Sequence, residues 1–123
     1  MKTSELSGAA LDWAVAKCEL LSGADYTLEV DKDVDGKLRI NFGGMYPEWS
    51  TDWAEGGEII ERERICLEDA AGMYWVATMQ YQNDDYDLIY QAEEQGTTPL
   101  IAAMRCHVAS CLGDEVQLPE ELK

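Results

Sequence analysis

Apolar residues recur at helical spacing near both ends of the chain, and this pattern most strongly limits the folds available to it. Ser7 precedes the first run as a potential N-cap, while Thr98 and Pro99 precede the second as cap and first helical residue. The two runs consist of Leu11, Ala14, Val15, Cys18 and Leu21, and of Leu100, Met104, His107, Val108 and Cys111. We therefore predict an N-terminal and a C-terminal helix.

Between these two helices, much of the chain alternates apolar and polar residues, which is typical of half-buried strands. The alternating segments are residues 25–30, 37–42, 58–67, 73–81 and 86–92. The turn between the first two contains Asp-Gly, a pair that favours a hairpin. The pattern predicts an α+β fold, in which a small antiparallel sheet of about four or five strands is covered by the two terminal helices.

The length and composition fit one globular domain spanning residues 1–123. Hydrophobic residues make up 46% of the chain, which is enough for a sizeable core. The last residues are mostly polar, so we expect a short flexible tail from about residue 117. The N-terminus does not resemble a signal peptide and no segment is apolar enough to span a bilayer, so a cytoplasmic location is expected.

The charge of the chain is strongly one-sided, since 9 Lys and Arg stand against 25 Asp and Glu, giving a net charge of −16 at pH 7. Proteins that bind nucleic acid or anionic membranes neutralise phosphates with basic residues, so we expect neither contact. A negative field can instead attract a basic protein surface by imitating a phosphate backbone, or simply keep a small protein soluble. The solubilising interpretation carries more weight, because charge bears on solubility and association rather than on activity.

Residues 43–57 lack periodicity and are predicted to form a long loop rich in Trp and Gly. Irregular segments of this length are uncommon in small domains and tend to be functional or disordered, and the tryptophans argue against disorder. Two interpretations stay open. Either the two tryptophans plug the edge of the core while the Ser-Thr-Asp between them caps a helical turn, or their rings line a pocket for a planar group. The Gly pair at the end of the loop could also bring backbone amides close to an anion.

The four cysteines form no CxxC pair, which fits reduced thiols that are mostly buried. Cys106, His107 and Cys111 suggest a zinc site, yet on a helix the two cysteines point roughly 140° apart. We therefore predict no metal site at this place and no cofactor. His107 lies on the apolar face of the predicted helix and is interpreted as a core histidine.

The acidic hairpin turn resembles the start of an EF-hand loop, because Asp31, Asp33 and Asp35 precede a glycine with the spacing of the first calcium ligands. The residue at the closing position is Phe42 rather than the glutamate that completes such sites, and the flanking segments have the pattern of strands. A hairpin turn needs no metal. Calcium at Asp31, Asp33 and Asp35 is therefore the weaker alternative.

Four stretches of the sequence carry a family resemblance. They are residues 4–17, the Ser-Thr-Asp-Trp-Ala, Gly-Gly and Ile-Ile-Glu of residues 50–61, residues 98–105, and the Leu-Gly-Asp-Glu-Val and Pro-Glu-Glu-Leu of residues 112–122. Together they resemble the NinX-like family of small bacteriophage and prophage proteins, although Glu58 stands where that family often has proline. The resemblance implies a phage accessory protein that works in the bacterial cytoplasm, and it implies no particular activity.

The stretches that match the family are rich in polar and aromatic chemistry, which favours a ligand site built from the Trp-rich loop and the last helix. Tryptophan would stack on a planar group, hydroxyls and backbone amides would donate hydrogen bonds, and Arg105 would pair with an anion. An ion pair between Arg105 and one of the many carboxylates is the simpler interpretation of that residue alone. The candidate ligand-binding residues are Trp49, Ser50, Thr51, Asp52, Trp53, Gly56, Gly57, Thr98 and Arg105.

Three classes of function remain. The favoured one is a non-enzymatic counter-defence protein that sequesters a small nucleotide-type ligand in a Trp-lined pocket, which copies of the chain in a homo-oligomer could share. The alternative is an acidic, DNA-mimic-like inhibitor that binds a host DNA-binding or defence protein. An enzyme is least favoured, because the sequence has no serine elbow, P-loop, HExxH motif or paired Cys-His nucleophile.

Overall fold

The computed structural model describes residues 1–123 and builds them from three α-helices, five strands and two short 3-10 helices. In chain order these are η1 (Thr3–Glu5), α1 (Gly8–Leu21), β1 (Leu28–Lys32), β2 (Leu38–Phe42), α2 (Trp53–Glu63), β3 (Cys66–Ala70), β4 (Tyr74–Gln82), β5 (Leu88–Gly96), α3 (Pro99–Leu112) and η2 (Glu120–Leu122). The two terminal helices and the number of strands agree with the sequence pattern, so the predicted α+β fold is confirmed. None of the helices has the length and apolarity that crossing a membrane requires.

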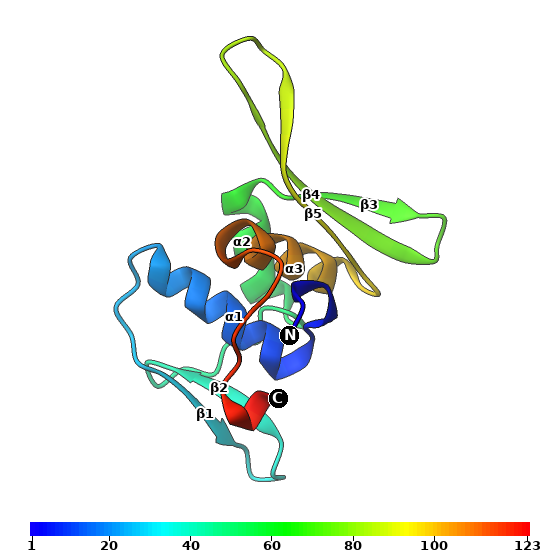
Figure 1. Ribbon diagram of the computed structural model, residues 1–123. Coiled ribbons are helices and arrows are strands. Elements are labelled where there is room, and N and C mark those ends of the chain that lie inside the picture. Colours follow the sequence, from blue (N-terminus) through cyan, green and yellow to red (C-terminus); the bar gives the residue numbers. More distant parts are fainter.

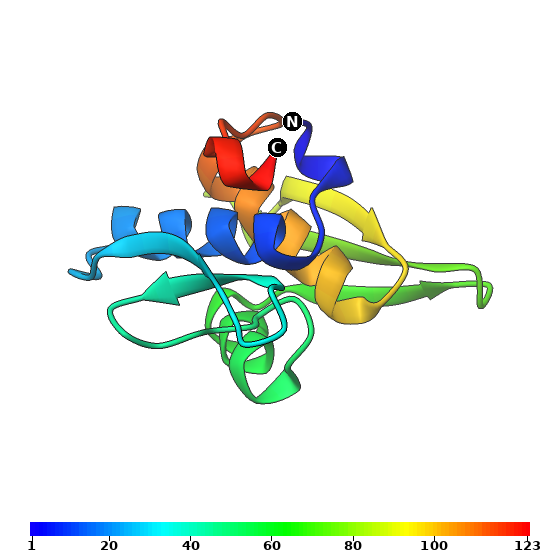
Figure 2. The same ribbon diagram turned by 90° about the horizontal axis from the view of Figure 1, so that it is seen from below.

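Helix α3 is the centre of the molecule, and the other elements surround it (Figure 1). Strands β4 and β5 pack against it, and so do α1 and α2. The β1–β2 hairpin contacts α1 from the side away from α3, as Figure 2 also shows. The buried residues of α3 are Leu100, Ala102, Ala103, Met104, Cys106, His107 and Val108. A helix that buries residues on most of its circumference has to lie inside the core rather than on its surface.

The five strands form two separate antiparallel sheets instead of the single sheet expected from the sequence. Strands β1 and β2 pair with Val30 opposite Ile40, and β3, β4 and β5 form a meander with β4 in the middle. The register of β4 and β5 shifts between Met79 and Gln80. Beyond this bulge the two strands extend away from the body as an isolated ribbon, drawn in yellow-green in Figure 1. We call this ribbon, residues 80–90, the hairpin arm.

Residues 53–63 form helix α2, so the strand predicted for residues 58–67 is wrong. Ile59 and Ile60 are adjacent and both pack against the core, which fits a helix better than an alternating strand. Asp52 caps the helix through its side chain, and the irregular segment therefore ends there instead of at residue 57. Helix α2 thus stands in the chain between the β1–β2 hairpin and the three-stranded sheet.

The C-terminal segment is packed against the core, which differs from the flexible tail expected from about residue 117. Leu118 and Leu122 are 6% and 8% exposed and belong to the core cluster. The amino group of Met1 donates to the carbonyl of Val116 at 3.0 Å, and the Val116 amide donates to the Met1 carbonyl at 2.9 Å. The two ends of the chain are therefore held side by side (Figure 2).

Candidate functional site

Four of the candidate residues line one hollow of about 200 Å³ between the start of α2 and the start of α3. Its lining consists of Ser50, Thr51, Trp53, Thr98, Leu100 and Ile101. Both helix starts are fixed by capping side chains: Asp52 accepts the Ala54 amide at 2.8 Å, and the Thr98 hydroxyl accepts the Ile101 amide at 3.1 Å. The structure thus brings the Trp-rich segment and the start of the last helix together around an aromatic ring and hydroxyl groups.

The two tryptophans of this segment have different surroundings. Trp49 is half-buried and packs edge-to-face on Phe42, with ring centroids 6.0 Å apart. Trp53 lies in the first turn of α2 and is 54% exposed. Trp49 therefore plugs the edge of the core, and Trp53 alone presents a ring to a ligand.

The two glycines of the segment lie inside α2, and only Gly56 has a packing role. A Cβ at Gly56 would collide with the carbonyl oxygen of Trp49 and would lie 2.6 Å from Cδ2 of Leu100. At Gly57 the nearest atom would be 3.9 Å away. The Gly56 amide donates to the Asp52 carbonyl at 2.8 Å, so it is not free to bind an anion. Gly56 instead allows α2 to pack closely against its surroundings.

A buried carboxylate lies behind the Trp-rich segment. Asp12 of α1 is 5% exposed, and its Oδ1 accepts the amide of Ser50 at 2.8 Å. Burial raises the pKa of Asp12 to about 6 in spite of this hydrogen bond, and the charges of Glu48 and Glu55 add to the rise. Perturbed carboxylates are frequent in functional sites, but Asp12 does not line the hollow at Trp53. It lines a separate, smaller hollow of about 70 Å³ that Ser50 and Thr51 share with the β1–β2 hairpin. In the sequence Asp12 looked like a polar interruption, although its helical spacing to Val15 placed it near the buried face.

Arg105 does not face the Trp-rich segment. Its Nε donates to the carbonyl of Leu6 at 2.8 Å, and its Nη1 donates to the carbonyl of Gln95, also at 2.8 Å. It lines a second hollow on the side of β5, together with Ser4, Glu93, Glu94, Gln95 and Gly96. The hollow at Trp53 therefore has no cation in its lining, and an anion bound there would lack the partner that the sequence suggested.

The acidic turn after β1 is closed by its own hydrogen bonds. Oδ1 of Asp33 accepts the amides of Asp35 and Lys37 at 2.8 and 2.9 Å. Oδ1 of Asp31 is paired with Nε of Arg39 at 2.7 Å. The carboxylates of Asp31, Asp33 and Asp35 do not converge on a common point. The hydrogen bonds of Asp33 are those of an ordinary hairpin turn.

The hairpin arm exposes large side chains of the segments that the sequence pattern predicted to be strands. Tyr86, Leu88 and Tyr90 are 80%, 66% and 66% exposed, and Tyr81 is 53% exposed. The acidic residues of the turn between the strands are Asp84, Asp85 and Asp87. The alternation of Tyr86, Leu88 and Tyr90 was a correct sign of a strand. It could not show that the strand leaves the body and that no other element covers it.

The tip of the hairpin arm has the same hydrogen bonding as the turn between β1 and β2. In each turn the first side chain, Asn83 or Asp33, accepts the amides two and four residues further on. The fourth residue has a left-handed backbone in both turns, with φ of 65° at Tyr86 and 82° at Gly36. Glycine is the residue that adopts this conformation without strain. Tyrosine at the same place is unusual and makes Tyr86 a candidate functional residue.

The comparisons with known proteins agree with the resemblance of the sequence. The family model described as bacteriophage P22, NinX, matches residues 2–111. Among curated proteins, none matches the chain. The matched range includes every helix and strand from α1 to β5, most of α3, the hollow at Trp53 and the hairpin arm.

Proposed function

The chain belongs to the bacteriophage P22 NinX family, and we propose that it is a phage accessory protein that binds a basic face of a host protein through the hairpin arm. This is the acidic inhibitor that the sequence raised as the alternative, with a contact surface proposed at residues 80–90. The observation that carries it is Tyr86, which is 80% exposed at the tip of the hairpin arm in a left-handed backbone conformation.

The backbone strain at Tyr86 is not offset by contacts within the molecule. Two other non-glycine residues have left-handed backbones, Arg64 at the C-cap of α2 and Ala71 in the turn after β3, but neither of them is an exposed aromatic residue. A non-glycine residue in the left-handed region costs roughly 1–2 kcal/mol, and the equivalent turn avoids this cost with Gly36. Because the Tyr86 side chain is exposed, it recovers little of this free energy through packing within the chain. Exposed tyrosines are frequent anchors of protein interfaces, where the ring fills a pocket of the partner. Contact with a partner protein would give this strained residue a role.

The charge of the hairpin arm indicates the kind of partner. Residues 80–90 contain three aspartates and no Lys, Arg or His, within a chain whose net charge is −16. Such a surface is attracted to a basic face, for example one that otherwise binds DNA, and the attraction speeds association more than it tightens the complex. Tyrosines would supply most of the affinity, and the aspartates would supply selection for positive charge.

The proposal is tested with Tyr86→Gly, which removes the ring and leaves a residue suited to the backbone. The matched control is Val34→Ser, because Val34 is fully exposed on the equivalent turn. Host proteins captured by the wild type and by the control are purified, and their dissociation constants are measured at low and high salt. We expect Tyr86→Gly to weaken binding by roughly 30-fold or more, the effect of losing an interface anchor. The thermal stability of this variant should be unchanged or higher.

The proposal fails if a host protein binds the wild type and Tyr86→Gly with equal affinity, or if binding does not weaken with salt. It also fails if the only species that depends on Tyr86 is a homo-oligomer of this chain, which light scattering would show. In the last case the hairpin arm would be a self-association surface, and the homo-oligomer suggested by the sequence would be its product.

A second candidate function is supported by the hollow at Trp53, where a planar group such as a nucleobase would stack on the exposed ring. Because no cation lines the hollow, we expect the base and not a phosphate to be recognised. Nucleosides and linear and cyclic nucleotides are titrated while tryptophan fluorescence is followed, with Trp53→Ala as the test and Tyr86→Gly as the control. Quenching that Trp53→Ala abolishes and Tyr86→Gly retains would favour the sequestering protein first predicted. The absence of quenching by any of these compounds would exclude them as ligands.

A further inference from the structure

A cluster of two thiols and an imidazole lies between α1 and α3, apart from the hollow and the hairpin arm. It consists of Cys18 on α1 and of His107 and Cys111, which are one turn apart on α3. Their three potential ligand atoms all lie within 4.8 Å of one another. Cys106 is not part of this cluster, in agreement with the helical argument against pairing it with Cys111. The second thiol comes instead from Cys18 on the other helix.

The buried histidine of this cluster has no hydrogen-bond partner. His107 is 1% exposed, and neither of its ring nitrogens is hydrogen-bonded. An unpaired polar group in the core costs about 1–3 kcal/mol, so buried histidines normally find a partner. Nε2 of His107 is 3.5 Å from Oε1 of Glu19, a distance that allows charge attraction but is too long for a good hydrogen bond. The ring therefore has the capacity to bind something that the chain alone does not supply.

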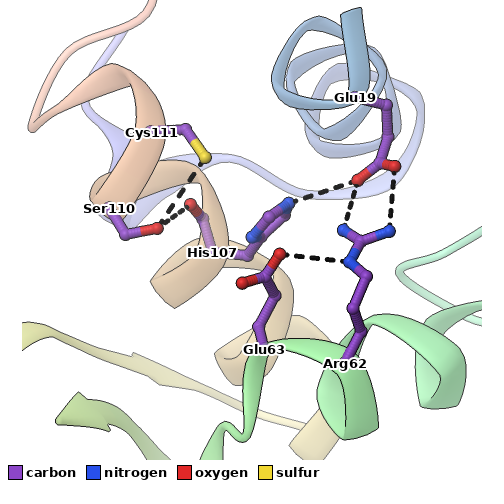
Figure 3. Close-up of polar contacts among 6 residues, drawn as sticks. All are labelled: Glu19, Arg62, Glu63, His107, Ser110 and Cys111. Carbon is purple, nitrogen blue, oxygen red and sulfur yellow. Dashed lines mark hydrogen bonds and ion pairs between the residues drawn. The ribbon is translucent and has the colours of Figure 1, made fainter. Parts of the chain in front are cut away.

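The surroundings of the cluster resemble the outer shell of a metal centre. Glu19 lies beside the imidazole and is held by Arg62, whose Nη2 and Nη1 donate to its two oxygens at 2.7 and 3.1 Å (Figure 3). Carboxylates that face a metal-bound imidazole usually orient the ring. The Ser110 hydroxyl, which donates to the His107 carbonyl at 2.7 Å, is 3.8 Å from Sγ of Cys111.

The cluster does not have the character of a nucleophilic site. A reactive cysteine needs an environment that favours the thiolate, such as a nearby cation or a helix N-terminus. Cys18 is fully buried, and this burial raises the pKa of its thiol far above the ordinary range. Cys111 is exposed, but it lies in the last turn of α3, where the helix dipole disfavours a negative charge.

We propose that Cys18, His107 and Cys111 form a binding site for a thiophilic divalent metal ion of the zinc class. Two thiolates neutralise the charge of such an ion, and the donor set of two sulfurs and one nitrogen is one that zinc prefers. Zn–S bonds of ~2.3 Å and Zn–N bonds of ~2.0 Å place the ligand atoms of a tetrahedral site ~3.5–3.8 Å apart, so a cluster within 4.8 Å needs to contract by about 1.3 Å at most. Because Cys111 is exposed, a metal ion can reach the site from solvent. The three residues leave the fourth coordination position of the ion open to water.

The proposal is tested by titrating the metal-free protein with Co²⁺ in the presence of a phosphine reductant, and then with Zn²⁺. The wild type should bind one equivalent of Co²⁺, show the charge-transfer absorption of thiolate ligands, and lose this absorption when Zn²⁺ displaces the cobalt. Cys111→Ser removes a ligand, so it should weaken Co²⁺ binding by roughly 100-fold or more, the upper end of what loss of an outer-shell partner costs, and reduce the absorption. Because Cys111 is exposed, this variant should fold normally. The control is Cys66→Ser, since Cys66 is also an exposed free thiol but lies on β3, outside the cluster.

Two results would overturn the assignment. One is a wild-type protein that shows no thiolate-to-cobalt absorption at one equivalent of metal. The other is an equal loss of binding in Cys66→Ser and Cys111→Ser, which would mean that the metal bridges surface thiols and not this cluster. Thermal unfolding gives an independent readout: Zn²⁺ should raise the Tm of the wild type and of Cys66→Ser, and should leave the Tm of Cys111→Ser nearly unchanged.

Discussion

Replacement of Asp12 by asparagine should make the stability of the protein less dependent on pH. In the folded chain, burial raises the pKa of Asp12 to about 6 from the ordinary aspartate value of 3.8. A difference of about 2 pKa units corresponds to about 3 kcal/mol, because one unit is worth ~1.4 kcal/mol. This is the free energy by which the ionised side chain of Asp12 destabilises the fold at neutral pH, relative to its protonated form.

The sign of the effect follows from the number of protons bound. Between pH 3.8 and about 6 the folded protein holds the Asp12 proton more tightly than the unfolded chain does. The stabilising contribution of the protonated form is therefore complete below pH 3.8 and is lost as the pH rises through 6. Glu19 acts in the opposite sense at lower pH, since its contacts with His107 and Arg62 lower its pKa to about 2. Burial also raises the pKa of Glu94, so in the wild type the interval from pH 4.5 to 7 reports both carboxylates, and the difference between Asp12→Asn and the wild type isolates Asp12.

Asparagine has no proton to lose in this range, and its side-chain oxygen can still accept the amide of Ser50. We expect the free energy of unfolding of Asp12→Asn, relative to that of the wild type, to rise by about 2–3 kcal/mol between pH 4 and pH 8. Urea unfolding followed by tryptophan fluorescence measures both proteins across this range. Asp84→Asn serves as the control for net charge, because it removes one negative charge from the exposed tip of the hairpin arm. If the difference between Asp12→Asn and the wild type stays constant from pH 4 to pH 8, burial does not perturb this carboxylate and the reasoning is refuted.

Further predictions concern the two helix starts at the hollow. Gly56→Ala should destabilise the protein by about 1–3 kcal/mol, because the added methyl group would collide with the Trp49 carbonyl and with Leu100. Gly57→Ala in the same helix should be neutral or stabilising by up to about 1 kcal/mol, and the urea midpoints of the two variants test this contrast. Thr98→Ala should cost about 1 kcal/mol, since the hydroxyl that accepts the Ile101 amide is lost. Thr98→Ser should recover most of that loss in thermal unfolding, and equal Tm values for the two Thr98 variants would contradict the capping role.

The terminal helices could be predicted from the sequence because their signals are local. Thr98 caps α3 as expected, and Pro99 is its first residue. Helix α2 could not be predicted in this way, because two neighbouring glycines each lower helix propensity by about 1 kcal/mol relative to alanine. The requirement for Gly56 comes from its contacts with Trp49 and Leu100. Such contacts between distant parts of a chain leave no periodic trace in the sequence, so the segment looked like a loop followed by a strand.

For the candidate site, as for the fold, the sequence indicated which residue types are available but not how distant segments come together. Composition singled out the Trp-rich segment and Thr98, which lie around one hollow, but it could not show that Arg105 is turned towards the Leu6 and Gln95 carbonyls. Helical geometry rejected Cys106 as a partner of Cys111 for a sound reason. It could not find Cys18, because spacing along one helix contains no information about the residue that a second helix brings next to it.

The hairpin arm and the hollow differ in how closely they are tied to the stability of the fold, and this difference is an argument for the hairpin arm as the proposed contact surface. The walls of the hollow include Thr98, the cap of α3, and Leu100, a core residue that α2 approaches through Gly56. Changing these residues to suit a ligand would weaken the fold. The exposed side chains of the hairpin arm lie beyond the bulge at Met79 and contribute nothing to the core. A protein that has to match the surface of a host target can vary residues there at little cost in stability, and a strained tyrosine at the tip costs only a small part of what the core provides.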